Sequence, residues 1–352
     1  MSLILEGMLL CLSSGHARRY REDVLRSAGL PAEAVIQFRY DDRHLGPGVR
    51  SLINAETIVG HQVLIAYCDQ AEKDREPEMI PCRYATIVSF ERAGTTVSVK
   101  LRLQDHAYSE QLAAFNTELH QLTAGLIPHR TETGKVAGSY FVELNVEPRA
   151  LVRTRGTENW QRLTEQLASR ADFNGYETFL LVRQVSGSSG TAVSANRAGQ
   201  IELKAGTRYV VKLYQYHPTK VPTATRIEAT TANTRVHFLS DSSFPLDSRY
   251  DHKELYFEVR PGIEADESTL KIVQKNGAAD EFSVEYDLPF TISSGWIRAL
   301  GYVLLLTLCL AAPHFVSELA KHTPPNWTLI GVATVSSICA ALIAVFQIRR
   351  II

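Results

Sequence analysis

The sequence ALGYVLLLTLCLAAPHFVS at residues 299–317 and the sequence WTLIGVATVSSICAALIAVFQI at residues 327–348 decide how this chain is organised. Neither run contains Asp, Glu, Lys or Arg. Each approaches the roughly 20 apolar residues that an α-helix needs to cross a bilayer. Residues 292–352 are therefore predicted to form a transmembrane hairpin with helices at about 297–317 and 327–348, and the preceding chain is a water-soluble head tethered to a lipid bilayer.

Positive charges near the hairpin predict its orientation. Arg298 lies at the start of the first helix and Arg349 and Arg350 follow the second, whereas the turn between them holds Lys321 as its one Lys or Arg. Lys and Arg in short connections tend to stay in the cytoplasm, so both termini and the head are expected there, at an inner or plasma membrane. The apolar run Ile4 to Leu12 follows no Lys or Arg, and it is interpreted as a first strand instead of a signal peptide.

Small residues recur at every fourth position of the second predicted membrane helix. Such ridges let helix backbones approach closely and favour helix association. Two interpretations remain open, an oligomer formed across chains and packing of the two helices within one hairpin. The ridges consist of Ala333, Ser337 and Ala341 and, beside them, of Ser336, Ala340 and Ala344.

Residues 1–174 predict an α+β domain, with a possible sub-boundary near residue 130. In Thr96 to Leu103, apolar and polar residues alternate, which predicts a half-buried strand paired with Arg83 to Phe90 in a hairpin. Leucine and phenylalanine at three- and four-residue steps predict a helix from Ser109 to Leu126, with Ser109 as its N-cap. We expect a small curled sheet or barrel with this helix as its cover. Further predicted elements are strands at 34–40, 61–67 and 140–146, a loop at Gly46, Pro47 and Gly48, and a helix at 158–169.

Residues 175–291 predict an all-β domain. Short candidate strands separated by turn residues indicate a β-sandwich of immunoglobulin-like size, although the Cys, Trp, Cys pattern of true immunoglobulin domains is missing. Ser186 to Ala198 is predicted to be a flexible loop. Only 287–295 separate the last predicted strand from Trp296, so the sandwich should sit close to the bilayer. The candidate strands are 178–185, 200–204, 208–216, 225–230, 234–239, 255–259, 269–273 and 282–286.

The sequence lacks the common catalytic, metal-binding and cofactor-binding motifs, which predicts a protein without catalytic residues, metal or cofactor. The formal net charge of -1 gives no overall attraction to nucleic acid. Five cysteines without a CxxC spacing argue against a disulfide framework or a zinc site. The motifs GxSxG, GxxxxGK[ST], GxGxxG and HExxH do not occur. The nearest thing to a constellation, Asp105 and His106 with His120 and His129, is interpreted as surface or helix-end histidines.

The stretch from His16 to Arg50 is the strongest candidate for a binding site in the head. Arginine side chains beside aromatic rings suit recognition of a phosphate together with a base. Acidic residues such as Glu22, Asp23 and Asp42 are interleaved with them, which favours the alternative of ordinary surface ion pairs. The candidate residues are Arg18, Arg19, Arg21, Arg39, Tyr40, Arg43 and Arg50.

The order of head, short stalk and hairpin predicts a membrane-anchored sensing or binding protein, in which binding to the head drives oligomerisation or membrane perturbation. This layout is similar to that of membrane effectors in prokaryotic signalling and antiviral defence systems, although no motif identifies a family. Two alternatives are a passive scaffold that recruits a cytosolic partner and an extracytoplasmic adhesion or receptor head of reversed topology. Expected partners are the bilayer, another protein or a second copy of the chain, and a phosphate-bearing ligand or nucleic acid at the stretch from His16 to Arg50, which we call the arginine stretch.

Overall fold

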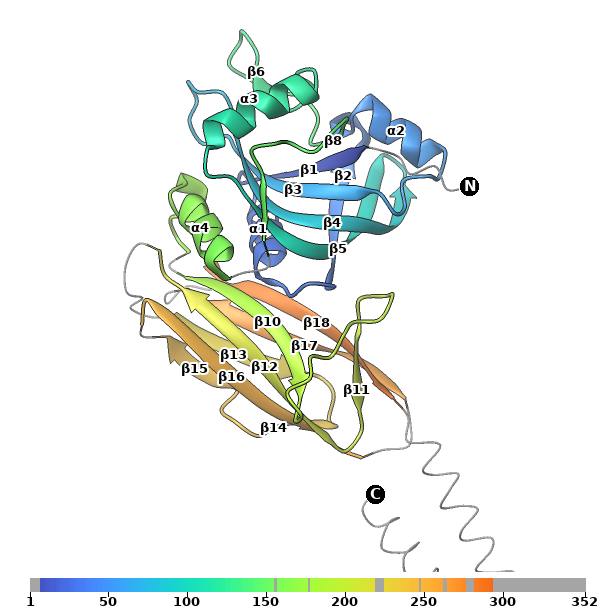
Figure 1. Ribbon diagram of the computed structural model, residues 1–352, viewed down its shortest axis with the longest axis vertical. Helices are drawn as coiled ribbons and strands as arrows, with labels where there is room; N and C mark the ends of the chain where they lie inside the picture. The colour runs from blue at the N-terminus through green and yellow to red at the C-terminus, as the bar shows by residue number, and fades with distance from the viewer. Residues whose placement is uncertain are drawn as a thin grey trace, which may run out of the picture.

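The computed structural model describes residues 7–154, 157–176, 178–218, 225–246, 248–261, 265–276 and 282–293. These residues form two lobes, a mixed α/β lobe above a β-sandwich in the view of Figure 1. None of the helices in these ranges is long and apolar enough to cross a membrane. The helices predicted at 297–317 and 327–348, and the small-residue ridges on the second of them, lie outside the described residues.

The upper lobe is built on one mixed sheet with strand order β2-β5-β4-β3-β1-β8, to which β9 adds beside β5. β1 and β3 are parallel, and their neighbours run antiparallel. The sheet curls until its edges approach each other. Two contacts show this: Leu45 pairs with Phe141, and the Tyr40 ring stacks on Phe141 with centroids 5.4 Å apart. The strands are β1 (Met8–Ser14), β2 (Val35–Asp41), β3 (Gln62–Asp69), β4 (Glu78–Ala93), β5 (Thr96–Tyr108), β8 (Phe141–Leu144) and β9 (Val152–Thr154), with a separate pair β6 (His129–Arg130) and β7 (Val136–Ala137).

Helices cover both faces of this sheet, because its central strands are apolar on both faces. Val24 and Leu25 of α1 pack on the concave face beside Cys11, and Phe115 and Leu119 of α3 pack on the convex face. The prediction of a single covering helix was therefore wrong. The helices are α1 (Arg18–Gly29), α2 (Pro47–Asn54), α3 (Leu112–Leu122) and α4 (Thr157–Ala168), with short 3-10 turns η1 (Asp42–His44) and η2 (Ala171–Phe173).

The hairpin and the amphipathic helix of the upper lobe agree with prediction, but the helix starts differ. β4 and β5 pair antiparallel as expected. α3 begins at Leu112, its N-cap residue is Gln111, and the Ser109 predicted as cap is buried ahead of it. The predicted loop at Gly46-Pro47-Gly48 is the start of α2, with Pro47 in the first turn, where its missing N–H is not needed.

The lower lobe is a sandwich of two sheets with orders β10-β12-β16-β14 and β11-β18-β17-β13-β15. Their inward residues share one core, and the neighbouring strands are antiparallel except for the parallel pair β11 and β18. Each predicted strand of this lobe corresponds to a strand of the structure, and among the described strands of the sandwich β15 alone was not predicted. The strands are β10 (Phe179–Gly187), β11 (Ile201–Lys204), β12 (Thr207–Tyr216), β13 (Thr225–Thr231), β14 (Val236–Phe238), β15 (Ser243–Leu246), β16 (Tyr250–Val259), β17 (Asp266–Lys275) and β18 (Val284–Ser293).

Two corrections concern the sandwich. The segment predicted as a flexible loop is tied to the fold, because Ser186 pairs with Ala192 and Ala195 pairs with Ile201. β18 continues to Ser293 instead of ending at residue 286. The last described strand therefore runs almost to the predicted membrane segment, without the nine-residue stalk 287–295 that the sequence suggested.

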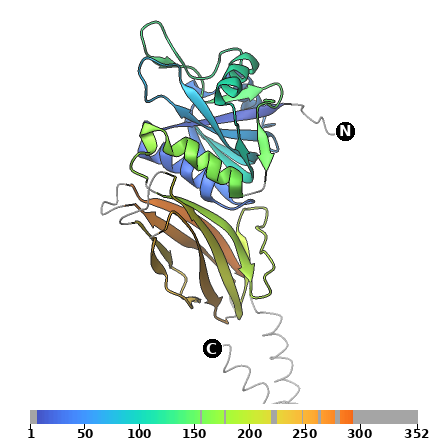
Figure 2. The ribbon, with the colours of Figure 1, turned by 60° about the vertical axis from the view of Figure 1, so that its left-hand side comes forward.

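Helix α1 joins the two lobes, and it lies beneath the sheet and against β10 and β18 (Figure 2). Gly29 is packed so tightly that a Cβ there would lie 2.3 Å from the Leu180 carbonyl oxygen and 2.5 Å from Cε1 of Tyr286. The Arg26 Nε donates to the Glu285 carbonyl at 2.9 Å. α1 is thus held directly against β18, the strand that leads towards the C-terminus.

The C-terminal end of α1 is held by the upper lobe through a buried arginine. Arg83, which is 2 % exposed, reaches the Ser27 carbonyl at 3.5 Å and donates from Nε to the Gln104 carbonyl at 2.6 Å. His106 Nε2 lies 2.8 Å from the Ala28 carbonyl. A cation at the carbonyl end of a helix is favoured by the helix dipole. Burial nevertheless lowers the pKa of Arg83 to about 9.

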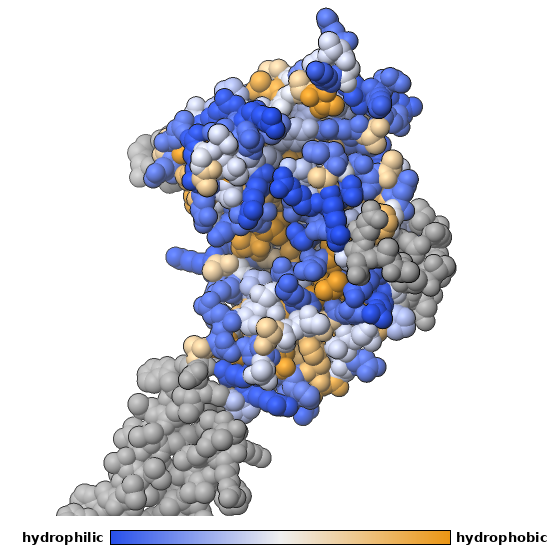
Figure 3. All heavy atoms as spheres, turned by 180° about the vertical axis from the view of Figure 1, so that it is seen from behind, coloured by the Kyte–Doolittle hydropathy of each residue, from blue (hydrophilic) through white to orange (hydrophobic). Residues whose placement is uncertain are grey.

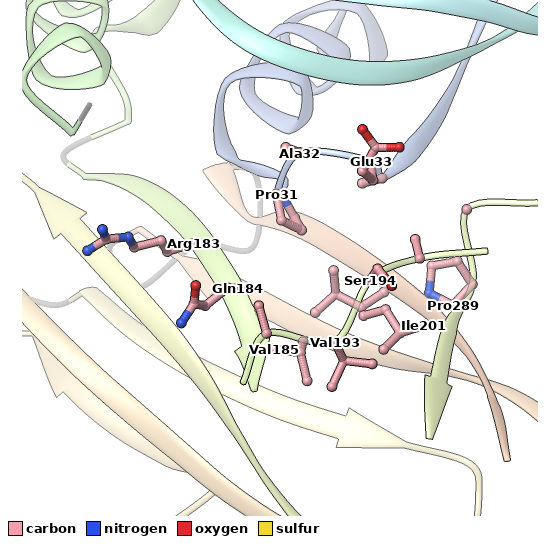
Figure 4. Close-up of a pocket in the computed structure, with 15 residues that line it drawn as sticks. Pro31, Ala32, Glu33, Arg183, Gln184, Val185, Val193, Ser194, Ile201 and Pro289 are labelled. Atoms are coloured by element: carbon pink, nitrogen blue, oxygen red, sulfur yellow. The ribbon is translucent and has the colours of Figure 1, made fainter. Parts of the chain in front are cut away.

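The joint between the lobes is not filled completely. A cavity of about 260 Å³ lies there. Figure 4 shows Pro31 and Ala32, from the α1–β2 connection, facing Val185 and Val193 of the sandwich across it. Apolar surface is also visible at the waist between the lobes on the face opposite to Figure 1 (Figure 3). The lobes therefore share a buried core around α1 and contacts such as that of Trp160 with Tyr216, and this cavity lies beside them.

Candidate anion-binding site

The structure gathers the central part of the arginine stretch around one cavity, which we call the arginine pocket. Its volume is about 510 Å³, within the ~300–1,000 Å³ range of small-ligand sites. The pocket lies between the start of α1, the end of β1 and the edge strand β2. Its walls are Leu12, Ser13, Ser14, His16, Arg19, Tyr20, Asp23, Phe38, Arg39, Tyr40, Asp41, Arg43, His44, Thr96 and Tyr140.

The turn from β1 into α1 forms one side of the arginine pocket. A Cβ at Gly15 would lie 1.6 Å from Oδ2 of Asp172, so a larger residue there would displace this carboxylate, which accepts a hydrogen bond from the Tyr67 hydroxyl. The N-cap residue of α1 is Ala17, which has no side chain able to cap the helix. The uncapped N–H groups at a helix start attract anions. The wall formed by His16 and Arg19 adds side-chain donors to this end of the helix.

Three arginines supply the positive charge of the pocket. The Arg19 guanidinium lies over the Tyr20 ring, 4.5 Å from its centroid, and donates to the Tyr20 hydroxyl at 2.6 Å. Arg43 Nε is 3.2 Å from His44 Nε2 and 3.8 Å from Asp41 Oδ1. Within the described residues, no hydrogen bond or ion pair joins the Arg39 side chain to another group. Arg39 is therefore the arginine whose donors remain most available to a ligand.

Aromatic rings line the floor and one side of the arginine pocket. The buried Tyr40 hydroxyl donates to the Leu12 carbonyl at 3.0 Å and lies 2.8 Å from Cys11 Sγ, so this ring is fixed in place. Tyr20 and Tyr140 are only partly buried, and the His44 ring meets Tyr140 edge-on with centroids 5.2 Å apart. Burial and the neighbouring Arg43 lower the pKa of His44, so that imidazole is neutral near pH 7. Partly exposed rings beside arginines provide faces on which a base can stack.

Two carboxylates moderate the charge of the arginine pocket. Asp41 accepts a hydrogen bond from the Arg43 backbone N–H at 3.1 Å and so belongs to the η1 turn. Asp23 is paired with Arg26 at 3.5 Å, but desolvation by burial raises its pKa to about 6. Asp23 is therefore the carboxylate of the pocket whose charge the fold disfavours.

Replacing Asp23 with asparagine is expected to stabilise the protein near neutral pH. The folded state raises this pKa from 3.8 to about 6, so folded Asp23 binds its proton more tightly than the unfolded chain. Stability is then greatest below pH 3.8 and falls as the pH rises through 6. We expect Asp23→Asn to raise the free energy of unfolding by about 1–2 kcal/mol at pH 7.5 and by much less at pH 4.5. Urea denaturation of the full chain in detergent at both pH values measures this, and an equal effect at the two pH values would contradict it.

The structure places the seven predicted site residues in four locations. Arg19, Arg39, Tyr40 and Arg43 line the arginine pocket. Arg18 instead reaches Ser283 at the joint, where its Nη2 lies 3.1 Å from the serine hydroxyl. Arg21 donates to the Gly15 carbonyl at 2.7 Å, and Arg50 donates to the Asp42 carbonyl at 2.8 Å in a neighbouring shallow cavity.

The histidine constellation suggested by the sequence does not assemble. His106 is at the joint with Arg83, whereas His120 belongs to α3 and His129 to β6. Over the described ranges, no group of three or more His, Cys, Asp or Glu side chains is arranged to hold a metal ion.

Sequence reasoning missed part of the arginine pocket. His16, Tyr20 and His44 lie inside the arginine stretch but were not selected, although Tyr20 and His44 are each next to a selected arginine in the sequence. Tyr140 arrives from a distant segment through the contact of β8 with β1, and nothing near it in the sequence indicates its position.

Comparison with known proteins does not place the chain in a family. No family model matches it, and no curated protein is similar to it. Among solved structures, the periplasmic chaperone SfaE is similar over 32% of this chain and 57% of its own, with 10% identity and a TM-score of 0.21. The S-layer protein SbsC domains 4 and 5 match over 33% of this chain and 54% of that one, with 10% identity and a TM-score of 0.19. A Bacteroides ovatus GH5 xyloglucanase matches over 31% and 19%, with 9% identity and a TM-score of 0.19.

These matches carry no functional argument. The chain spans little more than half the length of the first two structures and less than a fifth of the third. The site and its chemistry therefore rest on the residues of this chain alone.

Proposed function

We propose that this chain is a membrane-anchored sensor without catalytic activity, in which the arginine pocket binds a phosphate-bearing ligand such as a nucleotide. The observation that carries the proposal is the convergence of Arg19, Arg39 and Arg43 with partly exposed aromatic rings around one cavity at the start of α1. Guanidinium groups form paired, charge-assisted hydrogen bonds with phosphate oxygens. The rings of Tyr20 and Tyr140 supply faces for the base.

The route from the arginine pocket to the membrane is α1 itself. Its first turn faces the pocket, and its last residue packs on β10 and β18. A ligand that shifts the start of this helix also acts on its C-terminal end, since a helix of three turns moves nearly as a rigid rod. In the proposed arrangement, β18 of the immunoglobulin-like sandwich continues into the predicted transmembrane hairpin, so movement or pairing of sandwiches reaches the bilayer over a short connection.

The predicted hairpin and the charges around it support placement in an inner or plasma membrane with a cytoplasmic head. The head, sandwich and hairpin in this order support a signalling or defence role for the sensor. In this proposal the ligand acts by changing the association of heads or the state of the membrane helices, and the arginine pocket performs no chemistry on it.

The proposal is tested by a binding screen with the full chain in detergent. Inorganic phosphate, pyrophosphate, ATP and GTP are titrated and binding is followed by calorimetry. We expect at least one nucleotide to bind with a Kd in the micromolar range, and pyrophosphate to compete with it. If none of these probes binds at millimolar concentration, the arginine pocket is not a phosphate site.

A further inference from the structure

Strand β16 has an edge that the sandwich leaves partly open. β16 pairs with β12 along its whole length, but β14 covers it only from Phe257 to Val259. Over Tyr250 to Glu254, no strand within the described ranges pairs with this side of β16. The open segment begins at the α4 end of the sandwich, because Tyr250 pairs with Tyr216, whose ring meets Trp160 of α4 with centroids 6.5 Å apart. An uncovered edge of this kind is a template for a further strand.

The backbone groups at the open edge belong to alternate residues of β16. The Tyr256 carbonyl accepts from the Leu239 N–H at 2.8 Å, which shows that Tyr256 points its backbone groups towards the β14 side. Because this direction alternates along a strand, Tyr250, His252 and Glu254 point the same way. The His252 N–H has no strand partner there and donates to the carboxylate Oδ1 of Asp251 at 2.8 Å instead.

The charged residues of this segment would match those of a second, antiparallel copy of the same segment. Asp251 and Lys253 flank His252, and they form an ion pair of 2.8 Å within the strand. When two copies of this strand pair antiparallel with His252 opposite His252, each Asp251 lies opposite a Lys253. These are non-hydrogen-bonded positions, where opposing Cα atoms are only about 4.5 Å apart. Opposite charges directly across strands are stabilising.

We propose that a second copy of this chain docks on the open edge, pairing β16 with β16 antiparallel about His252. The second copy's carbonyl then replaces the Asp251 carboxylate at the His252 N–H, and that carboxylate is released to meet the opposing Lys253. Alternating charges discourage an unrelated strand, whereas they match this strand to its own copy. Tyr250, Tyr256 and Leu239, exposed by 43%, 45% and 45%, supply apolar surface beside the ladder. This pairing would be the oligomerisation step of the proposed function, and its biological role therefore rests on that function.

The first test uses charge reversal in the full chain in detergent, without any nucleotide, so its outcome is independent of the arginine pocket. Asp251→Lys alone and Lys253→Asp alone each place like charges opposite one another in a homodimer. Each is expected to raise the dimer Kd by about tenfold or more. Mixed together, the two variants restore both opposite-charge contacts, so we expect a heterodimer with a Kd within about threefold of the wild-type value. Sedimentation with one variant fluorescently labelled measures this.

A second measurement covers the case in which a reversed charge disturbs folding. With Cys309 and Cys339 changed to serine, His252→Cys is expected to form a disulfide-linked dimer under mild oxidation, because the two residues face each other. Glu258→Cys on the same strand should remain monomeric, since its two copies lie far apart in this register. The proposal is overturned if the mixed variants do not form a heterodimer and His252→Cys also forms no disulfide-linked dimer. Equal crosslinking at both positions would overturn it as well.

Discussion

Replacing both Arg39 and Arg43 with alanine is expected to weaken binding of the tightest nucleotide probe by about 100-fold or more. Each charge-assisted hydrogen bond contributes roughly 1.5–3 kcal/mol, and about 1.4 kcal/mol corresponds to tenfold in affinity. The two arginines stand on opposite sides of the Asp41 turn and both line the arginine pocket. Calorimetric titration of the full chain with ATP and GTP measures the loss.

Two single variants are matched controls for this prediction. Arg208→Ala removes an exposed arginine from the sandwich, far from the arginine pocket, and should leave affinity within about twofold. Arg50→Ala removes an arginine that the sequence selected but the structure places outside the pocket, bonded to the Asp42 carbonyl. Its effect should be smaller than that of Arg39→Ala. If Arg50→Ala weakens binding as much as the double variant, the ligand binds in the neighbouring cavity and not in the arginine pocket.

Replacing Gly29 with valine is expected to lower the free energy of unfolding by about 3 kcal/mol. Any Cβ at this position would lie 2.3 Å from the backbone oxygen of Leu180 and 2.5 Å from the ring of Tyr286. Both residues are only 1 % exposed. Neither neighbour can withdraw without moving β10 or β18. The helix must therefore separate from the sandwich. Urea denaturation of the full chain in detergent measures the change.

Gly187 is the matched control for Gly29. It lies in the sandwich, and the nearest atom to an added Cβ would be the Ser189 hydroxyl oxygen at 4.0 Å. Gly187→Ala should therefore change the free energy of unfolding by no more than about 0.5 kcal/mol. Equal effects of the two substitutions would show that the close packing of α1 on the sandwich contributes nothing to stability.

Most of the longer strands of this protein were predictable from its sequence because their patterns are local, whereas the short strands β6, β7 and β9 were not predicted. Alternation from Val97 to Leu103 identified β5, and turn pairs separated the strands of the sandwich. β15 was missed because it is short and contains Pro245, which removes a backbone donor. α1 was missed because charged residues dominate it, and its buried stripe of Val24, Leu25 and Ala28 is narrow. The sequence pattern there indicated a binding surface instead of a helix.

The arginine pocket was predicted in part for a similar reason. A run of arginines with aromatic neighbours is visible in the sequence, but which of them converge depends on tertiary contacts. Arg18 and Arg21 project from α1 towards the joint and the β1 turn, whereas Arg19 on the same helix lines the pocket. Tyr140 lines the pocket only because the sheet curls until β8 approaches the end of β2. Such closure depends on residues about 100 positions apart in the sequence, which local patterns do not report.

The most direct test of the account is hydrogen exchange of the full chain with and without a saturating concentration of its tightest-binding nucleotide. We expect the ligand to slow exchange in α1 and to alter exchange in β18, because α1 contacts both the arginine pocket and that strand. In Gly29→Val, the effect on α1 should persist while the effect on β18 disappears. Changes confined to the arginine pocket in the wild-type chain, with β18 unaffected by the ligand, would contradict the proposal that α1 carries the signal from the ligand towards the membrane.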